Sequence, residues 1–150
     1  GGLEPLRRCT ALVELWLFGN QFTGELEPLR SCKALQVLRL ENNQLAGGLE
    51  HIRGCTALRD LWLFDNQLTG ELEPLRSCKA LQILRLDNNQ LTGGLEPLRG
   101  CTALEELNLA SNQLTGDLRP LWGLLETLVT LDLEGNQLVP TGPELLSFHP

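Results

Sequence analysis

The sequence predicts an α/β solenoid, a right-handed superhelix in which each turn of the chain adds one strand to a parallel sheet. Three observations support this fold class. The pattern L-x-x-L-x-L-x-x-N-x-L occurs six times in 150 residues, with Phe22 in place of the last leucine in the first copy. Each copy contains two leucines spaced two apart, as a strand with one buried face requires. A proline-containing stretch follows most copies and predicts a short helical or 3₁₀ turn, because proline suits the first turn of a helix.

The spacing of the pattern predicts the domain organisation. Copies begin every 23 residues from Leu12 to Leu104, and the last begins 24 residues later. We expect a single domain over residues 1–150, with a half repeat over residues 1–11 and a C-terminal cap over about 139–150. Full repeats are predicted to begin at residues 12, 35, 58, 81 and 104, and a last partial repeat at residue 128.

Alternation within each strand predicts which side chains are buried. In the first copy, Leu15 and Leu17 face the core while Trp16 and Phe18 face outward. Stacked coils lie about 4.8 Å apart, so six of them form a six-stranded sheet on the concave side, with the helical turns on the convex side. No coil buries its leucines alone, so stability comes from the neighbouring coils.

An asparagine follows every strand, and we expect a structural role for it. Its amide can donate and accept hydrogen bonds, and can therefore satisfy backbone groups where the chain turns inward. We expect the glutamine after it to face solvent. The asparagines are Asn20, Asn43, Asn66, Asn89, Asn112 and Asn136.

The cysteines also recur with the repeat and are predicted to be buried, reduced thiols. Leu124 occupies the same column one coil later, so the column accepts a plain apolar residue. Parallel side chains on stacked coils are poorly aimed for a disulfide, and reduced thiols fit a reducing compartment. One cysteine per coil without a companion histidine predicts no zinc site. The cysteines are Cys9, Cys32, Cys55, Cys78 and Cys101.

On these motifs the chain resembles a leucine-rich-repeat protein from Leu3 to Leu138. The N-x-L-x-G-x-L stretch is similar to the class found in plant receptors and in repeat families of algae and other protists. The repeat departs from that class in being one residue shorter and in carrying the regular cysteine. The resemblance implies a solenoid that binds other proteins.

A two-coil block is duplicated within the repeats. Residues 12–57 and 58–103 differ at nine of 46 positions, among them Glu41/Asp87. The exposed strand face therefore alternates from coil to coil.

Charge and motif content argue against several function classes. A net charge of −7 disfavours nucleic acid as a partner. No apolar run approaches the roughly 20 residues that span a bilayer. His51 and His149 have no nucleophile placed to use them, and no glycine motif cradles a phosphate. We predict no catalytic residues, no metal and no cofactor.

The candidate functional site is therefore the concave face. Two Trp–Phe strands alternate with two strands that carry an arginine and an acid. A structural interpretation is that Arg39 stacks between Trp16 and Trp62 and pairs with Glu14 or Glu41. A functional one is that exposed aromatic and arginine side chains contact a partner protein. The predicted contact residues are Trp16, Phe18, Arg39, Trp62, Phe64 and Arg85.

An alternative function remains open at this stage. The chain can instead be a small accessory subunit, docked in a larger organellar assembly, such as a photosynthetic one, through its ends and convex face. Trp122 on the outer side and the uncapped N-terminal coil favour it. Either a neighbouring protein covers that N-terminal edge or the chain is a fragment. We expect an intracellular or organellar location, because no N-x-[ST] acceptor is present.

Overall fold

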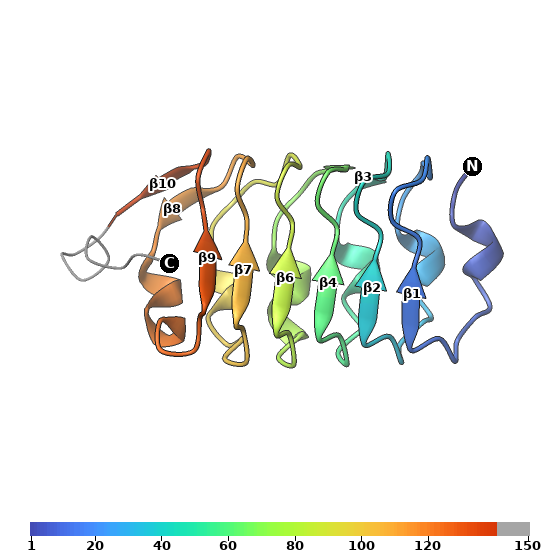
Figure 1. The fold of residues 1–150 in the computed structure, drawn as a ribbon, viewed down its shortest axis with the longest axis horizontal. Coiled ribbons are helices and arrows are strands. Elements are labelled where there is room, and N and C mark those ends of the chain that lie inside the picture. Colours follow the sequence, from blue (N-terminus) through green and yellow to red (C-terminus); the bar gives the residue numbers. More distant parts are fainter. Residues whose placement is uncertain (141–150) are drawn as a thin grey trace.

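The computed structural model describes residues 1–140 and shows a single row of stacked coils (Figure 1). Each coil adds one short strand to a six-stranded, fully parallel sheet, as predicted. The predicted C-terminal cap, about 139–150, falls almost wholly outside the described residues. The strands are β1 (Glu14–Trp16), β2 (Val37–Arg39), β4 (Asp60–Trp62), β6 (Ile83–Arg85), β7 (Glu106–Asn108) and β9 (Thr130–Asp132).

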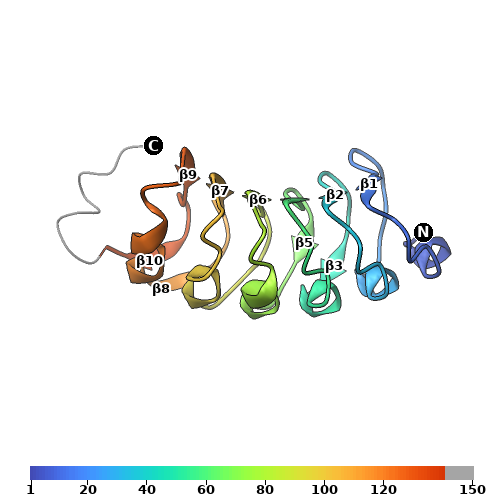
Figure 2. The ribbon, with the colours of Figure 1, turned by 90° about the horizontal axis from the view of Figure 1, so that it is seen from below.

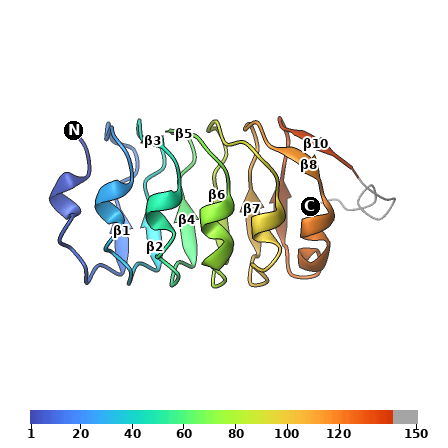
Figure 3. The ribbon, with the colours of Figure 1, turned by 180° about the vertical axis from the view of Figure 1, so that it is seen from behind.

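Within residues 1–140, a short 3₁₀ helix lies opposite the sheet in each coil up to the one before β9, so the predicted turns are 3₁₀ and not α (Figure 3). Proline lies in the first turn of five of these helices, where its missing N–H costs no hydrogen bond. The helices are η1 (Glu4–Leu6), η2 (Glu27–Leu29), η3 (Glu50–Ile52), η4 (Glu73–Ser77), η5 (Glu96–Leu98) and η6 (Arg119–Leu124).

Two further pairs of strands join neighbouring coils between the main sheet and the helices. They are parallel and two-stranded: β3 (Ala46–Gly47) with β5 (Gln67–Leu68), and β8 (Thr115–Asp117) with β10 (Gln137–Val139). Figure 2 shows the six main strands along the concave edge of the solenoid and the helices along its convex edge. Across residues 1–140, no helix has the length and apolar character needed to cross a membrane.

The core is a continuous column of leucines with the cysteines among them. Cys32, Cys55, Cys78 and Cys101 are fully buried, as predicted, and Cys9 in the first coil is partly buried. Leu124 fills the same column in the next coil and is also fully buried. The N-terminal edge leaves an apolar hollow of about 230 Å³, lined mainly by Leu3, Leu6, Leu17 and Phe22.

The asparagine column performs the predicted structural role. The Asn43 amide nitrogen donates to the Leu40 carbonyl at 2.9 Å and to the Leu17 carbonyl of the preceding coil at 3.1 Å. Its amide oxygen accepts from the Phe22 backbone N–H of that coil at 3.0 Å. Asn66, Asn89 and Asn112 repeat the arrangement, so each amide joins two coils. The glutamine after each asparagine is exposed, as predicted.

The residue before each of these asparagines has a left-handed backbone conformation, with φ between 55° and 73°. Glycine takes this conformation without strain, and Asn or Asp tolerates it better than other residues do. The column is Gly19, Asn42, Asp65, Asn88, Ser111 and Gly135.

Candidate functional site

The register of the sheet places four of the six predicted contact residues in one row across the concave face, and Phe18 and Phe64 follow two residues after Trp16 and Trp62. Trp16 is opposite Arg39, Arg39 opposite Trp62, and Trp62 opposite Arg85. Asn108 and Asp132 continue the row toward the C-terminus. The alternation expected from the duplicated block is therefore present in space.

The two arginines stack against the aromatic rings on either side. The Arg39 guanidinium carbon lies 5.0 Å from the Trp16 ring centroid, 4.5 Å from that of Phe18 and 4.1 Å from that of Trp62. Arg85 lies 5.3 Å from the Trp62 ring and 4.1 Å from the Phe64 ring. Such contacts are worth about 0.5–1 kcal/mol each at exposed sites and more when water is excluded.

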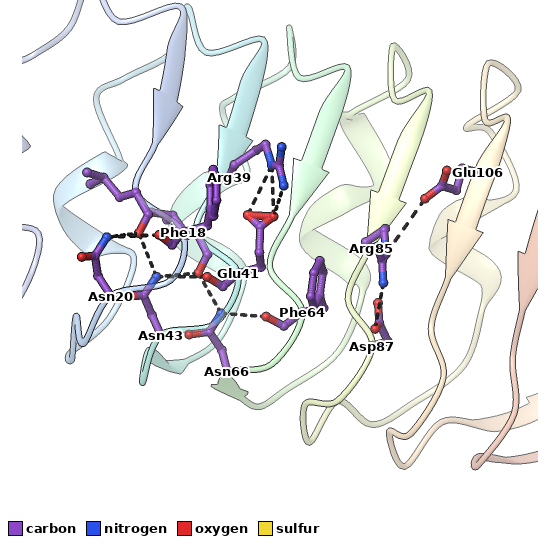
Figure 4. Close-up of polar contacts among 12 residues, drawn as sticks. Phe18, Asn20, Arg39, Glu41, Asn43, Phe64, Asn66, Arg85, Asp87 and Glu106 are labelled. Carbon is purple, nitrogen blue, oxygen red and sulfur yellow. Dashed lines mark hydrogen bonds and ion pairs between the residues drawn. The ribbon is translucent and has the colours of Figure 1, made fainter.

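Glu41 and Asp87 are buried, which corrects the prediction that they face solvent beside the arginines. Glu41 is only 1 % exposed and Asp87 only 6 % exposed. Both lie two residues beyond a strand end, where the chain begins its inward turn. Glu41 lies between Phe18 and Phe64 of the flanking coils (Figure 4).

Glu41 holds Arg39 firmly in place. Its carboxylate accepts hydrogen bonds from Arg39 Nε at 3.0 Å and from Arg39 Nη2 at 2.6 Å (Figure 4). A charge-assisted pair with two bonds fixes the plane of the guanidinium. The pairing of Arg39 with Glu41 and its stacking between two tryptophans match the structural interpretation of the sequence.

Asp87 holds Arg85 less completely. Its Oδ2 accepts one bond from Arg85 Nη2 at 3.3 Å. Arg85 Nε and Asp87 Oδ1 are both buried without a hydrogen-bond partner. Burial raises the pKa of Asp87 above its usual value, because the nearby Arg85 only partly offsets the loss of solvent.

Exposure along the row is uneven. Trp16 is 52 % exposed and Phe18 45 %, whereas Trp62 and Phe64 are half-buried. Asn108 and Asp132 at the C-terminal part of the row are polar, and Asn108 Oδ1 accepts from the backbone N–H of Ala110, two residues further on, at 3.0 Å. The exposed apolar surface of the concave face is therefore concentrated at its N-terminal end.

A second group of side chains gathers on the convex side, where the sequence indicated an isolated histidine. Among the described residues, Glu25, Glu50 and His51 form the one group of three potential metal ligands with all ligand atoms within 4.8 Å of one another. Sequence reasoning missed this group because Glu25 belongs to the preceding coil. The available signal was His51 itself, in a column that otherwise holds proline.

The four fully buried cysteine thiols have low reactivity. Burial raises the pKa of Cys55 and of Cys78 to about 11 and also raises that of Cys32 and Cys101. Because the thiolate is the nucleophile and the metal ligand, these groups are poorly suited to either role.

A parallel strand, an asparagine turn and a 3₁₀ helix in every coil define a class of repeat solenoids. Family models described as leucine-rich repeats match residues 56–100, 103–125 and 127–149. The chain belongs to the leucine-rich-repeat family. Such domains typically bind proteins or peptides and are typically non-catalytic, and no catalytic family is among the matches. The comparison with curated proteins gave no match.

Solved structures similar to this chain include plant receptor ectodomains. The ectodomain of the Arabidopsis thaliana receptor kinase GASSHO1/SCHENGEN3, in complex with CASPARIAN STRIP INTEGRITY FACTOR 2, is 34 % identical with a TM-score of 0.86, over 93 % of this chain and 17 % of its own. The Arabidopsis receptor kinase HAESA, in complex with the peptide hormone IDA and the co-receptor SERK1, is 32 % identical with a TM-score of 0.82, over 91 % of this chain and 24 % of its own.

A shorter relative is matched over most of its length. A chain of the BIR3–SERK2 complex from Arabidopsis thaliana is 32 % identical with a TM-score of 0.73, over 86 % of this chain and 70 % of its own. Against the first four similar structures, by contrast, this chain spans only 17 to 24 % of their length.

Proposed function

We propose that the chain binds a protein or peptide partner through the concave aromatic–arginine row. The row presents large rings and guanidinium planes side by side on a rigid sheet. Trp and Arg are the residue types most enriched among the side chains that dominate binding energy in protein interfaces. The proposed contact residues are Trp16, Phe18, Arg39, Trp62, Phe64 and Arg85.

The main support for this proposal is the fixed orientation of the Arg39 side chain. Three rings surround its guanidinium, and the buried Glu41 carboxylate fixes its orientation. A partner that docks on this surface does not have to immobilise a flexible arginine, so less conformational entropy is lost on binding. Trp16 and Phe18 remain exposed beside it and supply apolar area.

The arginine charges in the row are offset by neighbouring acids, which favours a partner that contacts the ring surfaces over one that is attracted by net charge. The Arg39 charge is offset by Glu41, and that of Arg85 by Asp87. Peptide recognition is also what one of the similar receptor structures describes, the complex of HAESA with the peptide hormone IDA. An extended peptide lying across the strands would contact several rings in succession.

The test uses a random peptide display library selected on the immobilised chain. Enriched peptides are then measured by fluorescence anisotropy against the Trp16→Ala and Phe18→Ala variants. Trp122→Ala is the matched control, because Trp122 is 41 % exposed but lies on the convex helix η6. We expect either concave variant to weaken binding at least tenfold, or about 1.4 kcal/mol, and the control to leave it unchanged. Peptides that bind both concave variants normally but lose affinity for Trp122→Ala would place recognition on the convex side and overturn the proposal.

A further inference from the structure

His51 occupies a position where the other five 3₁₀ helices of residues 1–140 have proline. Its counterpart in the duplicated block is Pro97, one of only nine differences between the two blocks. The imidazole is 11 % exposed, so it is held against the convex surface and does not extend freely into solvent.

Two carboxylates from successive coils converge on this imidazole. His51 Nε2 lies 3.2 Å from Glu25 Oε1 and 3.4 Å from Glu50 Oε1. A tetrahedral zinc ion with ligand bonds of about 2.0–2.1 Å separates its ligand atoms by about 3.3–3.4 Å. Two of the three distances in the group therefore already fit one ion. The three ligand atoms lie within 4.8 Å of one another, and the exposed glutamates can close the remaining gap.

Two glycines make room for these carboxylates. A Cβ on Gly47 would lie 2.6 Å from the Glu25 carboxyl carbon, and a Cβ on Gly48 would collide with Glu50 Oε2. The absence of side chains at Gly47 and Gly48 lets both carboxylates lie close to the backbone beside His51.

The duplicated block shows what happens without the histidine. Glu96 corresponds to Glu50, but it forms an ion pair with Arg99 at 2.9 Å, within its own coil. Glu50 instead turns toward His51. The Glu50 carboxylate, next to histidine, therefore points in a different direction from the Glu96 carboxylate, next to proline.

We propose that Glu25, Glu50 and His51 form a binding site for a divalent transition-metal ion of the zinc class. One imidazole nitrogen and two carboxylate oxygens are a donor set that zinc accepts. Mg²⁺ and Ca²⁺ prefer oxygen ligands alone. Because Glu25 lies in one coil and Glu50 and His51 in the next, the ion links adjacent coils. Its fourth ligand is water.

Arg30 competes with the ion for His51 and so affects the zinc affinity of this site. Its Nη2 lies 2.8 Å from His51 Nδ1, and a guanidinium can only donate, so Nδ1 accepts and Nε2 carries the hydrogen. Coordination through Nε2 moves that hydrogen to Nδ1, and the ring stays neutral. The N–H of Arg30 then faces the N–H of His51, so the exposed Arg30 must turn away for the ion to bind.

Isothermal titration of the untagged full-length chain with zinc chloride, under reducing conditions, tests the proposal. We expect one zinc ion per chain. His51→Pro restores the residue of the other helices and should fold, as circular dichroism would verify, yet we expect it to lower zinc affinity at least tenfold. Arg30→Ala removes the competing donor and is expected to raise zinc affinity several-fold. Magnesium chloride should produce no binding.

Two controls exclude other zinc ligands. His149→Ala changes the second histidine, and Cys9→Ala removes the cysteine that is only partly buried. Zinc binding that persists in His51→Pro, or disappears in either control while His51 is intact, would overturn the assignment. So would a wild-type chain that binds no zinc. None of these outcomes bears on the concave face, so this proposal and the proposed function fail independently.

Discussion

The two arginine strands of the concave face differ by a single methylene in their acid partner. After β2, Glu41 reaches both Nε and Nη2 of Arg39. After β6, Asp87 is one carbon shorter and makes a single 3.3 Å bond, which leaves Arg85 Nε and its own Oδ1 unsatisfied. The hydrogen bonds of the pair are thus complete in one block and incomplete in the other, where Arg85 Nε also lies 4.0 Å from Glu106 Oε2 (Figure 4).

The flanking residues enlarge this difference. Glu41 has a phenylalanine on the coil before it and another on the coil after it, whereas Asp87 has Phe64 on one side and Ala110 on the other. A buried polar pair stabilises a fold only when its hydrogen bonds are complete, because each unsatisfied group retains its desolvation cost. Two repeats with similar sequences can therefore contribute unequally to the free energy of folding.

The largest expected effect comes from removing each arginine in turn. Arg39→Met leaves the Glu41 carboxylate buried without a partner and should lower the free energy of unfolding by about 3 kcal/mol. Arg85→Met should cost about half as much in the free energy of unfolding, by the same reasoning, because its pair is already incomplete. Urea unfolding of both variants measures the difference. Equal losses would show that the pairs are energetically equivalent.

A reciprocal exchange of the acids gives a smaller effect. Asp87→Glu should supply the missing bond to Arg85 and raise the free energy of unfolding by about 1 kcal/mol. Glu41→Asp should lower it by a similar amount. Thermal and urea unfolding of both variants test this. If Asp87→Glu is instead destabilising, crowding against Phe64 outweighs the added hydrogen bond.

The smallest expected effect is a pH dependence. Because burial raises the pKa of folded Asp87 above its ordinary 3.8, its protonation favours the folded state. That stabilising contribution is complete below about 3.8 and is lost as the pH rises through the folded pKa. The stability of wild type relative to Asp87→Asn should therefore increase as the pH falls through this window.

Glu96→Gln provides a control of opposite sign. Arg99 lowers the pKa of Glu96 below its ordinary 4.5, so its contribution is present above that value and is lost at lower pH. Its slope should be shallow, because the pair is exposed and screened by solvent. Slopes of the same sign in both comparisons would contradict the assignment.

Most of the fold could be predicted from the sequence, because it depends on local spacing. Leucines two apart, such as Leu15 and Leu17, require a strand, and a fixed period requires neighbouring coils to align. The same period predicted that Trp16, Arg39 and Trp62 lie in one row.

The burial of Glu41 and the convergence on His51 could not be predicted in the same way. Alternation along a strand assigns position 41 to the outer face, but its exposure depends on rings contributed by two other coils. The environment of His51 depends equally on Glu25, which lies 26 residues away in the chain. Both features arise from contacts between coils, whose side-chain directions a linear pattern does not specify.

The buried cysteines allow the local opening of each coil to be measured separately. Each thiol from Cys32 to Cys101 is shielded by the adjacent coils, and Cys55 Sγ lies 3.5 Å from the Cys32 carbonyl oxygen. An alkylating reagent can therefore modify a given cysteine only when that coil separates from its neighbours. Alkylation rates read by peptide mass spectrometry would rank the coils by local stability at 23-residue intervals, with the partly buried Cys9 reacting first.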